Sequence, residues 1–269
     1  MNSRTIRLGI MMLFQYAIWG AWTTSLMPHL EKLEFTGSQI AAIYGCLWLA
    51  CMIAPFIGGQ FVDRLIPTQI FLGAAHLLGA ACLCVTALQT NFLPMWTWMF
   101  LYSLLYAPTL PLTNSLAFHH LRDAEGQFGR IRVWGTIGWI LAGWLVFLIR
   151  TTWHTETWTN RSDLLLIAAG LSFLMGLFCF ALPHTPPKKE SSSPLAFLEA
   201  LSMLKDKNFL LFILCSFVVT TELQFYYVPT AGFLRDLGMS EAKVPAALTL
   251  AQIAEILVLI FLLHLSLKK

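Results

Sequence analysis

Long apolar runs alternate with short polar breaks along the whole chain. The runs are about 20 residues long, which is the length that a helix needs to cross the hydrocarbon layer of a bilayer. The breaks contain charged residues and turn-forming residues, as expected for loops. The pattern predicts membrane-spanning helices over residues 8–30, 39–61, 67–88, 93–117, 131–149, 164–182, 209–230 and 245–265.

Composition and charge agree with a membrane protein. Hydrophobic residues make up 57% of the chain and charged residues 12%, whereas soluble domains carry about 25% charged residues. The net charge of +3 is too small to indicate a nucleic-acid partner. Most of the 17 Lys and Arg residues lie near the two termini and in the breaks after the even-numbered spans. Because cytoplasmic loops are enriched in Lys and Arg, we expect both termini to be cytoplasmic.

The longest polar break, residues 184–208, separates six spans from two. Ser193 followed by Pro194 is typical of a helix N-terminus, and leucines follow at helical spacing. We therefore expect a six-helix bundle over 1–183, a cytoplasmic linker with an amphipathic helix over 184–208, and a partial second bundle of two helices over 209–269. This layout is typical of transporters built from two repeated halves.

Two acidic residues, Glu222 and Glu255, lie inside the predicted spans. A carboxylate at this depth is costly unless it faces a partner or a wet cavity, so both residues mark candidate sites. Gln252 and Glu255 are three residues apart and share a helix face. Glu255 can bind a hydroxyl-rich ligand, exchange a proton or close a helix–helix hydrogen bond. Glu222 points roughly away from Gln224, so the two cannot both be central to one cavity.

Two further helix faces carry candidate binding residues. Arg132, Thr136 and Trp139 are spaced four and three apart in the fifth span, and they offer donors, a hydroxyl and a stacking surface. Alternatively, Arg132 extends to lipid phosphates and Trp139 only packs. In the seventh span, Gln224 and Tyr227 share a face.

Proline and glycine motifs predict local backbone features. Pro108 and Pro111 bend the fourth span, which makes either a packing kink or a broken helix that lines a cavity. The loop of residues 58–64 contains two glycines, which allow close helix approach, and ends in Asp63 and Arg64. We expect Asp63 and Arg64 to latch neighbouring helices through a charge-assisted hydrogen bond.

The histidines give no sign of a metal site. His119 and His120 are expected in a cytoplasmic loop, and His76 lies alone in the third span, where a hydrogen-bonded packing role is the commoner one. The seven histidines form no cluster along the sequence, and no metal-binding or nucleophile motif is visible. We therefore expect no cofactor and no enzymatic activity.

Six short segments form an ordered set along almost the whole chain. They are Phe14–Trp22, Pro108–Leu110, Ile131–Gly138, Leu182–His184, Glu222–Gln224 and Gln252–Glu255. Together they resemble the nucleoside–proton symporter family within the major facilitator superfamily. Residues 58–64 also resemble the loop between the second and third helices of that superfamily, which implies that Asp63 and Arg64 act in conformational gating. The resemblance implies an all-α membrane protein of the major facilitator type, with a six-helix N-terminal half and about two helices of the C-terminal half.

The resemblance also implies a function and a site. It implies nucleoside uptake coupled to protons by alternating access, with Glu255 and the glutamines binding ribose hydroxyls and polar edges of the base. The residues implied to face the substrate are Arg132, Thr136, Gln224, Gln252 and Glu255. Trp139 and Tyr227 differ from the residues expected in the family, and we expect both to line the pocket and to change its size.

Members of this family have twelve helices, so the chain resembles a C-terminally truncated transporter that we expect to work poorly alone. The expected partners are a nucleoside, protons and the lipid bilayer of a bacterial inner membrane; the oligomeric state and the preferred base stay open. Alternatives are a carrier of sugars or other polyhydroxylated solutes and a non-transporting membrane protein. A membrane enzyme using Glu222 or Glu255 would need a nucleophile or metal, and none is visible.

Overall fold

A helix, or a pair of helices, occupies each of the eight predicted spans. The computed structural model describes residues 3–57, 65–121, 123–187 and 202–266, and these residues contain helices and no strand. The α-helices are α1 (Ser3–Trp22), α2 (Met27–Lys32), α3 (Gly37–Ile57), α4 (Thr68–Ala87), α5 (Phe92–Tyr106), α6 (Thr109–His120), α7 (Ala124–Trp153), α8 (Asp163–Cys179), α10 (Lys207–Tyr227), α11 (Thr230–Asp236) and α12 (Val244–Ser266). The predicted all-α fold is confirmed in the described part of the chain.

Prolines divide three of the spans into two helices each. Pro28 lies in the first turn of α2, Pro108 precedes α6 and Pro229 precedes α11. Proline cannot donate the backbone hydrogen bond that would continue a helix, so each break lies where the sequence removes a donor. The bend predicted at Pro108 is therefore present.

A buried polar network fills the break at Pro108. The Gln15 side-chain amide donates to Thr109 Oγ1 (2.8 Å), and Thr109 Oγ1 donates to the Tyr106 carbonyl (2.5 Å). The Tyr106 hydroxyl donates to the Gln15 carbonyl (2.6 Å), and His76 Nε2 donates to Gln15 Oε1 (3.1 Å). Because each of these buried groups has a partner, the network stabilises the break. It also confirms that His76 is a hydrogen-bonded packing residue.

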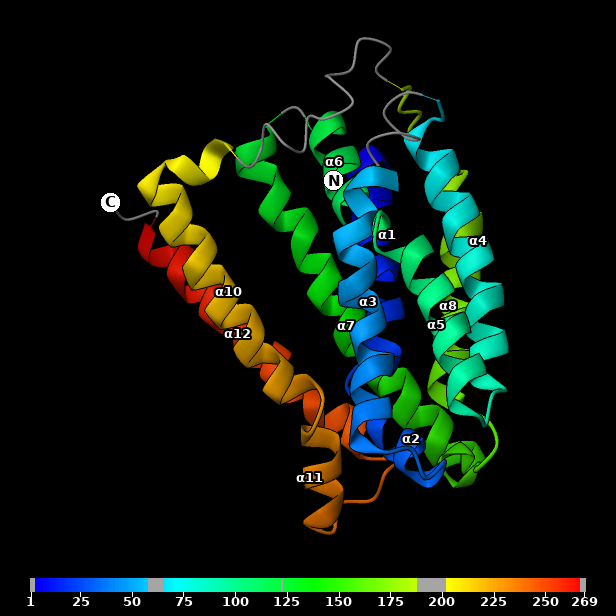
Figure 1. The fold of residues 1–269 in the computed structure, drawn as a ribbon. Coiled ribbons are helices and arrows are strands. Elements are labelled where there is room, and N and C mark those ends of the chain that lie inside the picture. Colours follow the sequence, from blue (N-terminus) through cyan, green and yellow to red (C-terminus); the bar gives the residue numbers. More distant parts are fainter. Residues whose placement is uncertain (1–2, 58–64, 122, 188–201, 267–269) are drawn as a thin grey trace.

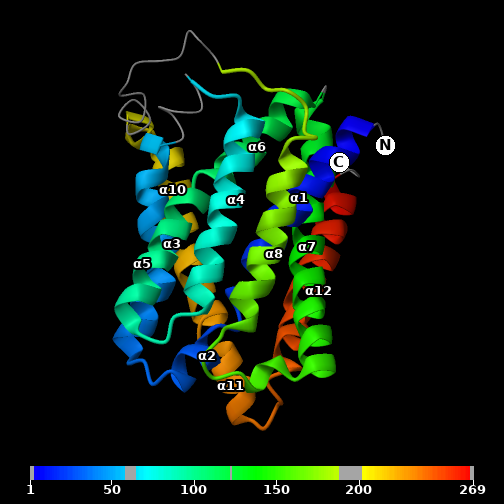
Figure 2. The same cartoon turned by 90° about the vertical axis from the view of Figure 1, so that its right-hand side faces the viewer.

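The helices α1 and α3–α8 form a bundle, and α10 and α12 lie on one flank of it (Figure 1). Figure 2 shows α10 and α12 apart from each other. α12 packs against α7 and α11 contacts α2, whereas none of the side chains of α10 is buried. The start of α1 and the end of α12 lie at the same end of the molecule (Figures 1 and 2).

Four stretches of the described chain are long and apolar enough to cross a membrane: Gly37–Ala54, Thr68–Ala87, Gly126–Trp153 and Lys207–Asp236. The third begins earlier than residue 131, because Asp123 accepts a hydrogen bond from the Gly126 backbone (3.0 Å) and caps α7. His119 and His120 lie in the last turn of α6, and not in a loop as predicted. Asp63, Arg64 and residues 188–201 of the predicted linker lie outside the described residues.

Two glycines of α7 allow neighbouring helices to approach closely. A Cβ at Gly138 would overlap the Leu13 carbonyl oxygen of α1. A Cβ at Gly143 would lie 2.6 Å from Thr249 Cγ2 of α12. Since carbon atoms normally contact at about 3.5–4.0 Å, both crossings depend on the missing side chain.

We expect Gly138→Ala to lower the free energy of unfolding by about 1–3 kcal/mol, because the new methyl group forces α1 away from α7. Gly129→Ala is the matched control, since Gly129 lies in the same helix with open space around its Cα. There the substitution should be neutral or slightly stabilising. Thermal unfolding of both variants in detergent measures the difference; equal melting temperatures would show that the close crossing does not matter.

Candidate functional site

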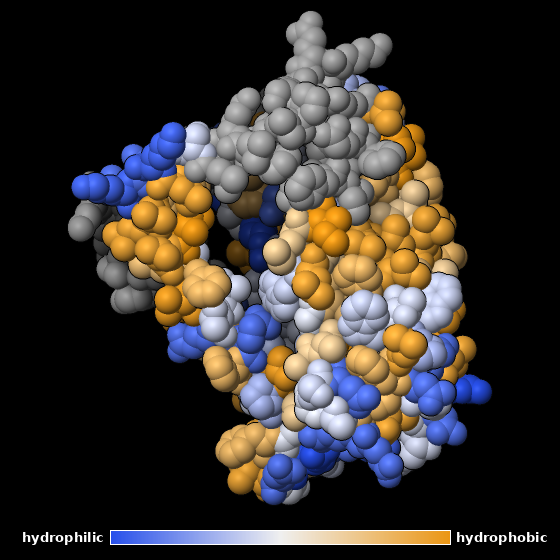
Figure 3. Space-filling view, viewed as in Figure 1, coloured by the Kyte–Doolittle hydropathy of each residue, from blue (hydrophilic) through white to orange (hydrophobic). Residues whose placement is uncertain are grey.

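A cavity of about 120 Å³ lies between the bundle and the separate helices α10 and α12. Figure 3 shows the surface hollowed between these helices and the bundle, with hydrophilic atoms visible inside. The cavity is lined by Tyr16, Trp19, Arg132, Gly135, Thr136, Trp139, Tyr227, Gln252 and Glu255. Its walls therefore come from α1, α7, α12 and the end of α10.

Six of the seven predicted binding residues line this cavity. Arg132, Thr136 and Trp139 come from one face of α7, while Gln252 and Glu255 come from one face of α12. Tyr227, the sixth, is the last residue of α10. Helical spacing predicts the shared faces within α7 and within α12, while the meeting of the three helices at one cavity was implied by the family resemblance. The role of these residues as ligands stays a prediction.

Gln224 does not line the cavity, in contrast to the prediction. Its side-chain amide donates to the Thr220 carbonyl of its own helix (3.4 Å), and the neighbouring Glu222 is exposed. The physical reason is that only the end of α10 reaches the cavity, and Gln224 lies almost one turn before that end. Residues 108–114 also lie outside the lining, which favours the packing interpretation of the proline motif.

Aromatic rings hold the polar groups of the cavity in place. The guanidinium carbon of Arg132 lies 3.8 Å from the centroid of the Tyr16 ring, within the range of a cation–π interaction. The Trp139 ring meets Trp19 edge-on and Tyr227 at a tilt, each with 5.5 Å between ring centroids. The cavity therefore combines a fixed cation with flat apolar surfaces.

Two polar atoms of the lining residues are buried without a hydrogen-bond partner. They are Gln252 Oε1, an acceptor, and Trp19 Nε1, a donor. A buried polar group without a partner costs about 1–3 kcal/mol. Other buried polar atoms of the described residues, such as Asn114 Oδ1, also lack a partner, but Gln252 and Trp19 line the cavity. These two atoms therefore suit a ligand that carries both a donor and an acceptor.

Sequence reasoning did not predict Tyr16 and Trp19 as site residues. The available signal is their spacing of three in the first span, which places both rings on one helix face. Aromatic residues at helical spacing more often form packing contacts, so spacing alone does not separate the two roles. Their role depends on the crossing with α7, which the sequence does not show.

At the opposite end of the molecule from the start of α1, charged residues join α2, α7 and α8 to α11 and to the segment between α11 and α12. Glu31 pairs with Arg235 (2.7 Å), and Lys32 pairs with Glu241 (2.7 Å). Lys32 Nζ also donates to the Glu156 carbonyl (2.6 Å). We call these residues, with Arg150 and Asp163, the end cluster.

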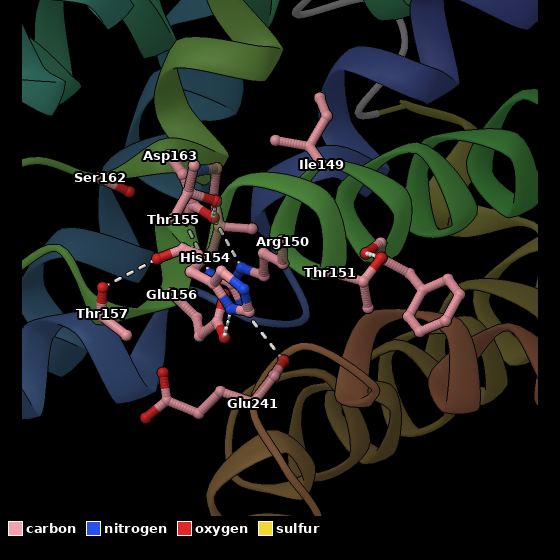
Figure 4. Close-up of polar contacts among 12 residues, drawn as sticks. Ile149, Arg150, Thr151, His154, Thr155, Glu156, Thr157, Ser162, Asp163 and Glu241 are labelled. Carbon is pink, nitrogen blue, oxygen red and sulfur yellow. Dashed lines mark hydrogen bonds and ion pairs between the residues drawn. The ribbon is translucent and has the colours of Figure 1, made fainter.

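Arg150 is the central residue of the end cluster and lies between Asp163 and Glu241 (Figure 4). It is only 5% exposed, and its guanidinium donates to both carboxylate oxygens of Asp163 (2.6 and 2.8 Å). It also donates to the Glu241 backbone carbonyl (3.1 Å), and Thr155 donates to Asp163 (2.8 Å). These buried contacts hold the segment between α11 and α12 against the bundle.

Comparison with known proteins decides the family. The whole chain, residues 1–269, matches the family described as "Nucleoside H+ symporter". The chain belongs to the nucleoside H+ symporter family. Because this is a family of membrane transporters, the apolar helices make the chain an integral membrane protein.

Relatives and a solved structure of this family agree along most of the chain. YegT of Escherichia coli is 39% identical over 256 residues, which are 94% of this chain and 60% of YegT. The nucleoside permease NupG of Escherichia coli is 31% identical over 228 residues, which are 81% of this chain and 53% of NupG. A crystal structure of the nucleoside transporter NupG matches with a TM-score of 0.78 and 30% identity, over 99% of this chain and 68% of that chain.

These comparisons confirm the predicted fold and show how much of a family member the chain covers. The fold is of the major facilitator type, as the match to NupG shows. The chain spans only 53–60% of the length of these two relatives, so it corresponds to part of a symporter of this family.

The unpaired amide oxygen in the cavity generates a stability prediction. In Gln252→Met the unpaired acceptor is lost at similar size, so we expect the free energy of unfolding without ligand to stay equal or to rise by about 1 kcal/mol. Gln224→Met is the matched control, because that amide is hydrogen-bonded and lies outside the cavity. Thermal unfolding in detergent tests both; a clear loss of stability only in Gln252→Met would mean that its oxygen has a partner.

Proposed function

We propose that this chain forms the N-terminal half and the first part of the facing wall of a proton-coupled nucleoside transporter in a bacterial inner membrane. The observation that carries the proposal is the convergence of Arg132 and Thr136 from α7 with Gln252 and Glu255 from α12, on one aromatic-walled cavity. The first unit is the bundle of residues 1–183, and residues 209–269 supply the second.

The chemistry of the cavity suits a nucleoside. A nucleoside has a flat base, which can lie against Trp19 and Trp139, and ribose hydroxyls, which can donate to Glu255 and to the unpaired oxygen of Gln252. Arg132 offers donors to the acceptor edge of the base. A sugar would use the same polar groups, but the C–H face of its ring covers less of the two aromatic surfaces than a flat base does.

The volume limits how much of the ligand this cavity holds. It is about 120 Å³, whereas pockets for complete drug-sized ligands are about 300–1,000 Å³. We infer that the cavity encloses only part of the nucleoside, and that the rest of the ligand lies in the adjoining hollow between the bundle and the helices α10 and α12 (Figure 3).

Alternating access also needs a closed end and an open end. The end cluster closes one end with ion pairs between the two units, and the surface is hollowed between them toward the other end (Figure 3). We propose that the hollowed end, where α1 begins, faces the cytoplasm, because most Lys and Arg residues of the sequence lie near the two termini and in the breaks after the even-numbered spans. The arrangement is then the inward-facing state, and opening to the outside requires separation of the end cluster.

Glu255 is the group that we propose to link ligand and proton. Its carboxylate is exposed to the cavity and belongs to the helix that packs on α7. A proton on Glu255 changes the charge opposite Arg132, and so changes the relative stability of the two access states.

We expect Glu255→Gln and Arg132→Ala to weaken nucleoside binding about 10–100-fold, because each removes a charge-assisted hydrogen bond worth about 1.5–3 kcal/mol. Equilibrium binding of radiolabelled uridine and adenosine to the purified chain measures the effect. Glu222→Gln is the control, since Glu222 is also an acidic residue inside a span but lies outside the cavity.

Competition with hexoses completes the binding test. Unlabelled uridine and adenosine should displace the labelled nucleoside, and hexoses should not. If hexoses compete equally well, or if Glu222→Gln weakens binding as much as Glu255→Gln, the proposed substrate or site is wrong.

A further inference from the structure

Two arginines of α7 are held in opposite ways. Arg150 is buried, and its guanidinium group donates to both carboxylate oxygens of Asp163 (2.6 and 2.8 Å). Arg132 has neither a hydrogen bond nor an ion pair with any residue that the structure describes, and its guanidinium carbon lies 3.8 Å from the centroid of the Tyr16 ring. A carboxylate neutralises an arginine and uses its donors, whereas an aromatic ring holds the cation and uses none of its N–H groups in hydrogen bonds to acceptor atoms.

A glycine makes room for the contact between Tyr16 and Arg132. A Cβ at Gly135 would lie 2.6 Å from Tyr16 Cδ2 and 2.7 Å from Arg132 Nη1. Both distances are well below the normal contact of about 3.5–4.0 Å, so the ring and the guanidinium group fill the space that a side chain at this position would need. Gly135 lies three residues after Arg132 and therefore on the same helix face.

The crossing of α1 and α7 fixes the Tyr16 ring in this place. Rings of each helix lie on glycines of the other helix, and Tyr16 of α1 on Gly135 is one of three such contacts. In the other two, a Cβ at Gly20 of α1 would lie 2.9 Å from the Trp139 ring, and a Cβ at Gly9 would lie 3.1 Å from the Trp134 ring. Rings that are packed this closely against a neighbouring backbone have little room to change rotamer.

We propose that Tyr16 is a positioning residue for nucleoside binding, and that its ring holds the guanidinium group of Arg132 at the cavity with its charge and its donors left for the ligand. The inference rests on the proposed function of this cavity. A side chain that is already held in place loses less conformational freedom when a ligand binds, so the affinity is higher. Tyr16 acts through Arg132 and needs no contact with the ligand.

A simpler role for Tyr16 is a direct contact with the ligand, because the ring also lines the cavity. A double-mutant cycle separates the two roles, with equilibrium binding of radiolabelled uridine to the purified chain as the measurement. We expect Tyr16→Leu to weaken uridine binding about 3–20-fold, which corresponds to the loss of one cation–π contact. In the Arg132→Ala background the same substitution should change binding by less than about twofold.

Conservative variants test whether the ring and the space beside it matter. The Tyr16 hydroxyl has no hydrogen bond to a described residue, so Tyr16→Phe keeps the contact and should bind uridine within about twofold of the wild type. Gly135→Ala should weaken binding, because the new methyl group displaces the ring or the guanidinium group. Gly129→Ala is the matched control in the same helix, since the space around Gly129 is open.

A second measurement needs no nucleoside. In the chain labelled with ¹⁵N-arginine and purified in detergent, nuclear magnetic resonance records the Nε–H signal of each arginine, and Arg132→Ala assigns the signal of Arg132. Because the aromatic ring current shifts nearby protons, Tyr16→Leu and Gly135→Ala should move this signal, and Tyr16→Phe should leave it close to its wild-type position. The signal of Arg150 should stay unchanged in every variant.

Two results would overturn the inference. One is an Arg132 signal that is the same in Tyr16→Leu as in the wild type, and the other is an equal loss of uridine binding by Tyr16→Leu with and without Arg132. If the wild-type chain binds no nucleoside, the proposed function fails, while the resonance measurement still decides whether Tyr16 holds Arg132. Circular dichroism checks that each variant keeps its helix content, and Tyr16→Phe against Gly135→Ala serves as the comparison if Tyr16→Leu does not fold.

Discussion

The close crossing of α1 and α7 at Gly138 is the constraint on which the candidate site depends. It brings Tyr16 and Trp19 of α1 against the polar face of α7, and the Tyr16 ring then supports the guanidinium group of Arg132. A second close crossing, at Gly143, brings α12 near enough for Gln252 and Glu255 to complete the wall. Small residues therefore position large ones, as is common where helices associate in membranes.

Polar groups inside the spans differ in how far their hydrogen-bonding capacity is used. Gln15 and His76 are hydrogen-bonded within the bundle and stabilise a broken helix. Gln252 and Trp19 each keep an unpaired polar atom and line a cavity, whereas Asn114, which also has an unpaired atom, does not. The bilayer core contains no water that could pair such atoms, so a ligand in the cavity can offset the cost for Gln252 and Trp19.

The sequence predicts much of the fold and most of the residues that line the candidate site. Span length and helical period predict the eight spans and the shared faces of α7 and α12, because both properties are local. The tilt of a helix depends on contacts between distant segments. The sequence therefore does not show that only the end of α10 reaches the cavity, and the prediction for Gln224 is wrong. The end cluster combines residues from distant loops, and Lys32 and Glu241 are 209 positions apart. Counts of Lys and Arg indicate which side of the membrane such loops face, but they do not indicate which charged residues pair with each other.

The attachment of α10 has a mechanical consequence. Tyr227 lies at the end of α10, beside the proline break that joins it to α11, while the rest of the helix has no buried side chain. A helix of 21 residues is about 30 Å long, so a rotation about this break moves its far end by many ångströms and Tyr227 by very little. Tyr227 therefore lies at the pivot of this rotation, and the aromatic wall of the cavity can keep its shape while the rest of α10 moves.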